Sequence, residues 1–282
     1  MKFIDFFSGI GGFRLGMEMA GHECVGHCEI DKYADKSYRS MHNVKENEFY
    51  ANDITRIEPA DLPDAECYCG GFPCQSFSIA GKRGGFDDTR GTLFFEVMRL
   101  ANVRRPQYLL LENVKGLLSH DGGRTFGTII STMGELGYDA EWQVLNSKNF
   151  GVPQNRERVF IIGHLRNGSG REVFPIEETN RNIGTPIKRL AHSRYYRRIL
   201  QTYDTSGSCE AIDTMQGGNR QPVFYCNGKY KKASPKECFR LQGFPDEYFE
   251  RAKSVNSNSQ LYKQAGNSVT VNVIYEIARR LE

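Results

Sequence analysis

The chain has 282 residues and a mass of 32.1 kDa, of which 39% are hydrophobic and 25% charged. This composition is typical of a globular protein with one large domain, or a large and a small one, and it excludes disordered, collagen-like and coiled-coil chains. The net charge of +3 is unevenly spread, because residues 164–233 carry 12 Lys and Arg against 6 Asp and Glu. A basic segment in an otherwise mildly acidic chain predicts contact with a polyanion.

The cellular compartment is predicted from what the sequence lacks. No run approaches the roughly 18–20 apolar residues of a membrane helix, and the residues after Met1 do not resemble a signal peptide. Eight cysteines are few for this length, so reduced thiols are expected rather than disulfides. We therefore expect a soluble cytoplasmic protein that does not contact a membrane.

The first two-thirds of the chain alternate short apolar runs with helical patterns. This alternation predicts an α/β fold in which helices cover a parallel sheet. Helices are expected over 13–20, where Gly21 ends the pattern, and from Leu93 to just before Pro106. The expected strands are 2–7, 24–30, a short one ending near 51–53, 65–70, 108–111 and 158–165.

Beyond Leu165 the pattern loosens. Residues 176–230 are polar, Arg-rich and Gly-rich with few periodic runs, so they favour a recognition module over a core. At the end of the chain, Asn267 and Ser268 are expected to cap a final helix whose apolar face is formed by residues 273–281.

The first strand leads into a glycine-rich turn, DFFSGIGG at 5–12. Glycines between a strand and a helix allow the backbone to approach a ligand closely, but the spacing is not that of a dinucleotide-binding turn. Glu29 and Asp53 follow the next two strands, where an acid suits ribose hydroxyls. These residues predict a nucleoside-type cofactor without a diphosphate; an ordinary tight turn with solvated acids is the alternative.

The fourth strand ends in GGFPCQS at 70–76, which places Cys74 in a loop at the same sheet edge. A cysteine nucleophile needs nearby positive charge, because an unperturbed thiol is mostly protonated at neutral pH. A structural cysteine is the alternative. Zinc is disfavoured, since Cys67 and Cys69 fall on a predicted buried strand and no clear fourth ligand appears.

Two further charged groups are expected at this edge. Glu112 follows the apolar strand 108–111, and burial there would favour its protonated form. Arg156 and Arg158 are two residues apart on a predicted strand and share a face, so anionic partners are expected for both. A helix cap for the acid and a surface row of salt bridges for the arginines are the alternatives.

Together these motifs resemble those of the DNA (cytosine-5)-methyltransferases, in family order and over nearly the whole chain. The matching stretches are DFFSGIGG at 5–12, GFPCQ at 71–75, ENV at 112–114, QNRER at 154–158, RLQGFP at 240–245 and GNSV at 266–269. The resemblance implies a Rossmann-like, S-adenosylmethionine-dependent methyltransferase sheet with a second, smaller target-recognition domain. It divides the chain into a catalytic and cofactor-binding domain (1–177), a target-recognition domain (178–254) and a segment that returns to the catalytic domain (255–282).

The resemblance also implies the reaction, which is transfer of a methyl group from S-adenosyl-L-methionine to carbon-5 of a cytosine in a specific short double-stranded DNA sequence. The target base is flipped out, and Cys74 attacks carbon-6 to form a covalent intermediate. Glu112 matches the acid that bonds ring nitrogen-3, Arg158 the arginine that reaches the base oxygen, and Arg156 its neighbour that holds the site. No metal is predicted.

The binding residues are carried over from the same motifs. Ile30 departs from the family, whose members often have an aromatic residue there against the adenine. The expected cofactor residues are Phe7, Gly9, Gly11, Gly12, Glu29, Ile30, Asp53, Ile54, Leu93, Asn267 and Ser268.

DNA contacts are expected in two places. The Gly-rich stretch 76–92 carries cations suited to phosphates, although any Gly-rich surface loop looks similar. The stretch TMQGGNR at 214–220 resembles the core of the target-recognition region, with Gln216 and Arg220 as candidate base readers. The predicted DNA-binding residues are Gln75, Ser76, Lys82, Arg83, Arg90, Gln216, Gly217, Gly218, Arg220 and Arg240.

We expect a monomer whose partner is double-stranded DNA, with a cognate restriction endonuclease as a further candidate partner. Three alternatives stay open: the family branch that methylates tRNA, a non-catalytic DNA-binding module and an NAD-type oxidoreductase. RLQGFP and the Gly-Gly core favour DNA over tRNA. The presence of Cys74, Glu112 and Arg158 favours an enzyme, and the missing diphosphate turn disfavours a dinucleotide.

Overall fold

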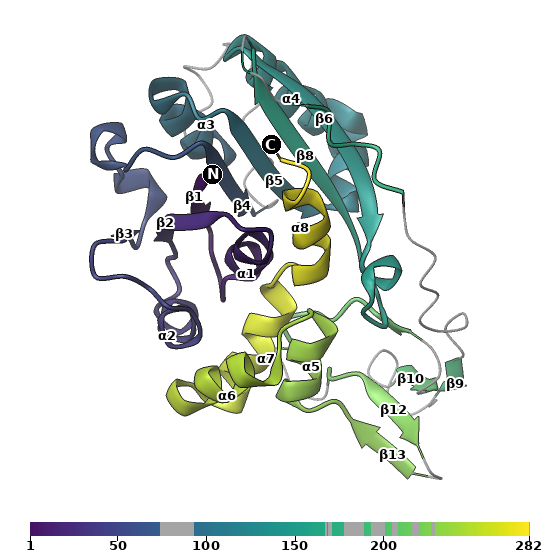
Figure 1. Cartoon of the computed structure of the whole chain (residues 1–282). Helices are drawn as coiled ribbons and strands as arrows, with labels where there is room; N and C mark the ends of the chain where they lie inside the picture. The colour runs from purple at the N-terminus through teal and green to yellow at the C-terminus, as the bar shows by residue number, and fades with distance from the viewer. Residues whose placement is uncertain are drawn as a thin grey trace.

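The computed structural model describes residues 1–73, 93–166, 168, 171–177, 189–192, 201–204, 208–215, 220–226 and 229–281. A large sheet with helices on both faces forms most of the molecule, and a small sheet lies at its lower end beside helix α5 (Pro235–Leu241) (Figure 1). No helix in these described ranges is long and apolar enough to cross a membrane.

The large sheet has seven strands in the order β3-β2-β1-β4-β5-β8-β6. The first five strands in this order are parallel, whereas β8 pairs antiparallel with β5 and β6 pairs antiparallel with β8. The expected parallel sheet is therefore confirmed for five strands only. The bounds are β1 Lys2–Phe6, β2 Glu23–Cys28, β3 Phe49–Ala51, β4 Cys67–Gly71, β5 Tyr108–Val114, β6 Tyr138–Asn146 and β8 Glu157–Leu165.

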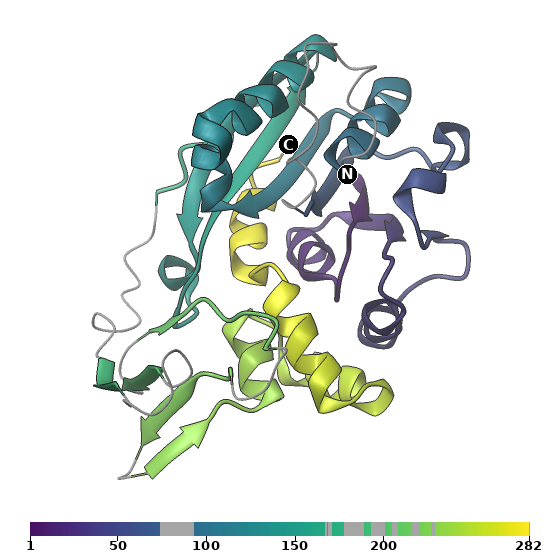
Figure 2. The ribbon, with the colours of Figure 1, turned by 180° about the vertical axis from the view of Figure 1, so that it is seen from behind.

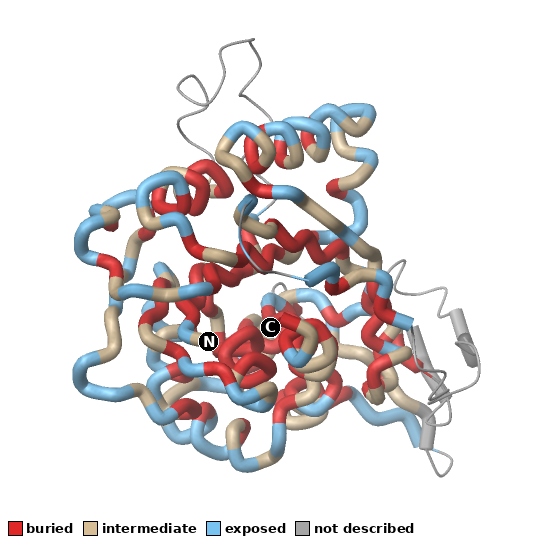
Figure 3. Tube along the Cα trace, turned by 45° about the horizontal axis from the view of Figure 1, so that its top comes forward, coloured by how far each residue is buried: buried red, intermediate tan, exposed pale blue. Residues whose placement is uncertain are grey.

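Helices cover both faces of this sheet because its central strands are apolar on both sides. On β5, Leu109 and Leu111 join the core cluster formed with α3 (Leu93–Arg104) and α4 (Arg124–Glu135). Tyr108 and Leu110 join the opposite cluster, with α1 (Gly12–Met19) and α8 (Val271–Ala278). Figure 2 shows α3 and α4 on the face seen from behind, and Figure 3 shows buried residues concentrated along the central strands.

The final helix differs from its expected start. Asn267 is the last residue of α7 (Asn258–Asn267) and Ser268 is its C-cap, while α8 begins at Val271 after Thr270. The predicted cap at 267–268 is therefore wrong, because a polar pair before an apolar run can equally end one helix before another begins. The last helix returns to the start of the chain, where the ring of His22 hydrogen-bonds the carbonyl of Ala278 at 2.9 Å.

The loosely patterned segment contributes more structure than its sequence indicated. A four-stranded sheet has the order β13-β12-β10-β9, and β11 (Cys209–Glu210) pairs with β7 (Gln154–Asn155). Cys209, Ile212 and Met215 are buried in a third core cluster, which also contains residues of α1, α2 (Lys32–Met41), α5 and α6 (Asp246–Val255). This segment was expected to be a poor core, and that expectation is wrong for these three residues. The strands of the small sheet are β9 Arg189–His192, β10 Gln201–Asp204, β12 Val223–Cys226 and β13 Lys229–Lys232.

Short 3-10 helices complete the connections between these elements. Their bounds are η1 Ile54–Arg56, η2 Pro59–Asp61, η5 Lys115–Gly123 and η6 Ser147–Phe150.

Candidate active site

The parallel strands β1, β2, β4 and β5 end at one edge of the large sheet, and a cavity of about 440 Å³ lies there. Ligands of such sheets bind beyond the carboxyl ends of the strands, and this volume is within the range of small-molecule sites. The cavity is lined by Phe7, Gly9, Cys28, Glu29, Ile30, Asp31, Ala34, Asn52, Asp53, Ile54, Gly71, Phe72, Pro73, Leu93, Glu112, Asn113, Val114, Arg156, Arg158, Lys263, Gln264, Gly266 and Asn267.

The glycine turn holds the carboxylate of Glu29 in this cavity. Phe7 and Gly9 both have positive φ angles, which turns the backbone N–H of Gly9 toward Glu29 Oε2 at 2.7 Å. The backbone N–H of Asp31 donates to the other carboxylate oxygen, also at 2.7 Å. Burial raises the pKa of Glu29. Since a carboxylate can accept about four hydrogen bonds, Glu29 keeps capacity for hydroxyl donors of a ligand.

The neighbouring wall is mostly apolar and has one acid. Ile54 is buried, and Ile30 is 77% exposed although it lines the cavity. Asp53 accepts hydrogen bonds from Thr55 N at 3.0 Å and Thr55 Oγ1 at 2.8 Å, and these bonds lower the pKa of Asp53. This wall fits a flat, partly apolar group with an exocyclic donor, and Glu29 fits the hydroxyls of an attached sugar.

A carboxylate and a guanidinium meet farther along the same cavity. Arg158 Nε lies 2.9 Å from Glu112 Oε1, with both side chains mostly buried. The contact joins the neighbouring strands β5 and β8 at the cavity. A side chain at Gly71 would collide with the Glu112 carboxylate, so glycine on β4 provides the space that this carboxylate occupies.

Arg156 has partners other than the anions that were expected. Its guanidinium is buried and donates to the carbonyls of Ile212, Gly266 and Ser268 at 3.1, 3.2 and 2.9 Å. Burial lowers the pKa of Arg156 to about 9. The expectation of an anionic partner is therefore wrong for Arg156. Its guanidinium instead connects its own segment to two others that are distant in the sequence, the one around Ile212 and the one at 266–268.

Sequence reasoning missed several residues of the site. Asn113 Nδ2 donates to the carbonyl of Phe72 at 2.8 Å and so holds the segment that leads to Cys74. Lys263 pairs with Asp31 at 2.7 Å and closes one side of the cavity. Asp31 is the N-cap of α2, a position that its place between a strand and a helical pattern could have revealed. Nothing in the sequence indicated Lys263.

Some predicted residues lie elsewhere. Gly11, Gly12 and Ser268 do not line the cavity but pack behind its wall, Gly11 against His42 and Gly12 against Ser268 and Val269. Arg220 pairs with Asp213 at 2.8 Å, and Arg240 with Asp246 at 2.6 Å. The predicted residues outside the described part of the chain are Cys74, Gln75, Ser76, Lys82, Arg83, Arg90, Gln216, Gly217 and Gly218.

The two cysteines of β4 lie inside the sheet. Cys67 and Cys69 are buried free thiols on β4, and burial raises the pKa of both. Across the described ranges, no three or more His, Cys, Asp and Glu side chains are grouped so as to hold a metal ion.

Comparisons with known proteins identify this arrangement. The family described as C-5 cytosine-specific DNA methylase matches residues 1–194 and 166–282. The Type II methyltransferase M.HhaI of Haemophilus parahaemolyticus is 36% identical, and the match covers 99% of this chain and 93% of that protein. The Type II methyltransferase M.NgoBI of Neisseria gonorrhoeae is 39% identical, and the match covers 99% of this chain and 92% of that protein.

Solved structures share the fold. The Dnmt2 methyltransferase of S. pombe superimposes with a TM-score of 0.74 at 18% identity, covering 99% of this chain and 97% of that one. The Entamoeba histolytica methyltransferase EhMeth gives a TM-score of 0.72 at 17% identity, covering 98% and 96%. The expected fold class and family resemblance are thereby confirmed. The chain belongs to the C-5 cytosine-specific DNA methylases, enzymes that transfer a methyl group from S-adenosyl-L-methionine to carbon-5 of cytosine in DNA.

Proposed function

We propose that the cavity at the sheet edge holds S-adenosyl-L-methionine at its Glu29 end and the flipped cytosine at its Glu112 end. The observation that carries this proposal is that one cavity joins the Glu29 carboxylate to the Glu112–Arg158 ion pair. A methyl donor and an acceptor base must lie in contact for direct transfer, and a continuous cavity allows this.

The cofactor end is assigned by the chemistry of its wall. Glu29 accepts hydrogen bonds from the ribose hydroxyls, and Asp53 faces the adenine amine. The cofactor supplies an electrophilic methyl group. The apolar side chains of Phe7, Ile54 and Leu93 line the same cavity, and they exclude water around that group.

At the Glu112 end of the cavity, Cys74 is proposed to form a covalent bond to the cytosine. Cys74 directly follows the cavity-lining residue Pro73 in the sequence. The Cys74 thiolate forms a bond to carbon-6 of cytosine, and the displaced π electrons make carbon-5 nucleophilic. Glu112 bonds ring nitrogen-3 and Arg158 the base oxygen, which stabilises the charge that develops on the ring. Carbon-5 would take the methyl group as the sulfur–methyl bond of the donor breaks, which would leave S-adenosylhomocysteine. A base then removes the carbon-5 proton, and the bond between the Cys74 sulfur and carbon-6 breaks.

DNA recognition is assigned to residues 178–254. Gln216, Gly217, Gly218 and Arg220 are proposed to contact bases, because the stretch TMQGGNR resembles the family's recognition core. Gln75, Ser76, Lys82, Arg83, Arg90 and Arg240 are proposed DNA contacts, the cations among them to phosphates. We further propose that the chain acts as a monomer. A restriction endonuclease with the same target is a proposed partner, supported by the Type II designation of the relatives.

The test begins with the target site. Bisulfite sequencing of DNA from cells that express the chain identifies the modified cytosine and its sequence context. A duplex with 5-fluorocytosine at that position, incubated with protein and S-adenosyl-L-methionine, is then expected to form an adduct that survives denaturation. Fluorine replaces the proton that must leave, so the covalent intermediate is trapped.

Two controls make this experiment decisive. Cys74→Ser is expected to abolish both the adduct and methyl transfer while duplex binding survives. A labelled methyl group is expected to be transferred to duplex DNA and not to tRNA. An adduct that persists in Cys74→Ser, or transfer to tRNA alone, contradicts the proposed function.

A further inference from the structure

We propose that His42 is a positioning residue for the cofactor site, and that its ring acts by a hydrogen bond to the glycine turn. The inference rests on the proposed function, in which that turn and Glu29 hold S-adenosyl-L-methionine. His42 does not line the cavity, so its role is indirect.

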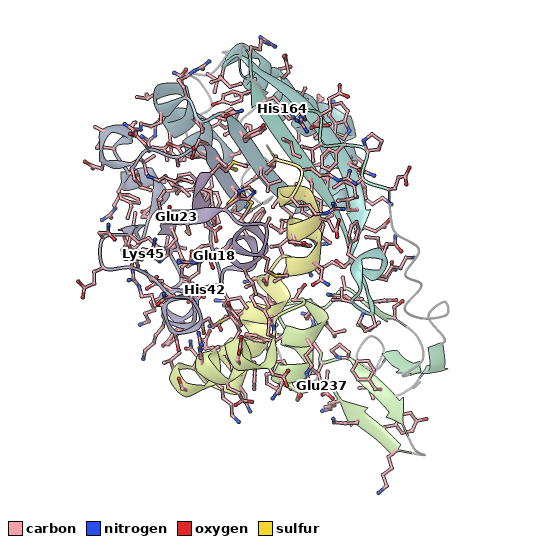
Figure 4. The ribbon with its side chains drawn as sticks, in the orientation of Figure 1. Glu18, Glu23, His42, Lys45, His164 and Glu237 are labelled. Atoms are coloured by element: carbon pink, nitrogen blue, oxygen red, sulfur yellow. The ribbon has the colours of Figure 1, made fainter. Side chains whose placement is uncertain are left out.

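His42 contacts the middle of the glycine turn on the side away from the cavity. His42 is the C-cap of α2 and is only 5% exposed, and its Nε2 lies 2.9 Å from the carbonyl oxygen of Ile10. Figure 4 labels His42 near α1 and α2. A Cβ atom at Gly11 would collide with the imidazole ring, so the glycine is required for this approach.

The partner of Nε2 determines which nitrogen carries the proton. A carbonyl oxygen can only accept, so Nε2 must donate. Burial lowers the pKa of His42 to about 3, so the ring is neutral at physiological pH and its other nitrogen, Nδ1, is unprotonated. Nδ1 is buried and has no hydrogen-bond partner in the described part of the chain, which agrees with a neutral ring whose one proton is on Nε2.

Two aromatic rings fix the orientation of His42. The ring centroid of Tyr38 lies 4.8 Å away and that of Tyr248 5.4 Å away. Tyr38 belongs to α2 and is itself held by Arg14, whose Nη1 donates to the Tyr38 hydroxyl at 3.3 Å. Tyr248 belongs to α6, so rings from two helices hold the imidazole against the turn.

The hydrogen bond acts on Glu29 through a short stretch of backbone. Ile10 directly follows Gly9, whose N–H donates to Glu29 Oε2 at 2.7 Å. Within the turn, Gly11 N also donates to the carbonyl of Ser8 at 2.8 Å. His42 therefore binds one side of the turn, and the other side of the turn binds Glu29, the acid proposed to accept from the ribose hydroxyls. Loss of the Nε2 donor frees the Ile10 carbonyl and loosens the position of the Gly9 N–H.

Two variants separate the hydrogen bond from the packing of the ring. His42→Phe keeps an aromatic ring but removes the donor, whereas His42→Gln places an amide N–H near the position of Nε2. We expect His42→Phe to raise the Kd for S-adenosylhomocysteine, measured by calorimetry, by about fivefold to tenfold, because a turn that has lost this hydrogen bond must be ordered again when the ligand binds. His42→Gln is expected to stay within about threefold of the unmodified chain.

Two further measurements report on positioning. In His42→Phe, the KM for S-adenosyl-L-methionine should rise with the Kd while kcat at saturating cofactor stays within about twofold. Hydrogen exchange of the amides at 9–12 should accelerate without ligand. His22→Phe is the matched control, because His22 is also a buried histidine bound to a carbonyl, that of Ala278. It lies before β2, at the opposite end of that strand from the cavity. Its Kd should not change.

Each outcome has a defined meaning. An unchanged Kd in His42→Phe overturns the inference, and so does an equal loss in His42→Phe and His42→Gln, which would show packing alone. Glu29→Gln tests the proposed function separately. If Glu29→Gln weakens binding and His42→Phe does not, only the role of His42 is refuted; if Glu29→Gln has no effect, the cofactor assignment of the cavity is wrong.

Discussion

Arg158 and Glu112 come from adjacent antiparallel strands, β8 and β5, and Arg158 Nε lies 2.9 Å from Glu112 Oε1. Because both side chains line the cavity, the pair brings an acid and a guanidinium to the proposed position of the target base. The Arg158 guanidinium can release the Glu112 carboxylate and bind the oxygen of the base instead. It is therefore already in position to stabilise negative charge that develops on that oxygen.

Glu112→Gln tests the acid directly. The amide retains a hydrogen-bond donor but cannot transfer a proton to ring nitrogen-3, so we expect kcat to fall by roughly 10²-fold or more. The Kd for S-adenosylhomocysteine should not change. Glu157→Gln is the control, since Glu157 pairs with Lys115 at 3.0 Å and does not line the cavity. Equal kcat values for the two variants would remove Glu112 from the proposed chemistry.

Glu29 predicts a pH dependence of cofactor binding. Burial raises the pKa of Glu29, and only its carboxylate form can accept from both ribose hydroxyls while holding two N–H donors. Affinity for S-adenosylhomocysteine should therefore weaken as pH falls from 7 to 5, because protonation removes acceptor capacity.

Glu29→Gln should bind about tenfold more weakly at pH 7 and show little of this dependence. Asp53→Asn provides the contrast, because the pKa of Asp53 is lowered by its bonds to Thr55 and this acid does not titrate in that range. Calorimetry at matched ionic strength measures all three proteins. An identical pH profile for the unmodified chain and Glu29→Gln would assign the titration to another group.

Arg156 predicts a loss of stability rather than of chemistry. Arg156→Met leaves the carbonyls of Ile212, Gly266 and Ser268 without their donor in a buried setting, which should lower the free energy of unfolding by about 3 kcal/mol. Urea denaturation measures this loss. Arg158→Met is the comparison, because its guanidinium contacts Glu112 and the carbonyl of Glu157 beside the cavity, where water can replace it; it should lose less stability but more kcat.

The sequence was sufficient to predict the strands that carry the site, because periodicity and turn residues act locally. It did not reveal β6, an edge strand with polar residues such as Asp139, Glu141 and Gln143. An edge strand needs less apolar surface, so its pattern resembles a loop. The antiparallel pairing of β8 also depends on β6, and no local pattern encodes strand direction.

The hydrogen-bond partners of Arg156 and His42 could not be predicted from the sequence either. The acceptors of Arg156 lie 56 to 112 residues away in sequence, and that of His42 lies 32 residues away. Carbonyl oxygens exist at every position, so a sequence cannot mark those that bind a buried donor. Glu29, in contrast, follows a strand at a position where sheet geometry alone predicts a ligand.

Asp5 predicts that stability depends on pH with a sign opposite to that of most acids. It is fully buried on β1, and burial raises its pKa well above the usual value of 3.8. Between those two pKa values the folded state keeps a proton that the unfolded state releases. The contribution of Asp5 to stability is therefore complete below pH 3.8 and is lost as pH rises through the folded pKa.

Asp5→Asn lacks this titration, so its stability relative to the unmodified chain should increase from pH 4.5 to pH 8, as measured by urea denaturation at several pH values. Asp246→Asn gives the opposite slope, because hydrogen bonds from Arg240 and Lys236 lower the pKa of Asp246. That variant should be less stable than the unmodified chain at pH 7, and the difference should shrink toward low pH. If the stability difference between Asp5→Asn and the unmodified chain does not change with pH, Asp5 has the same pKa in the folded and unfolded states. That result would contradict the raised pKa expected for a buried carboxyl group.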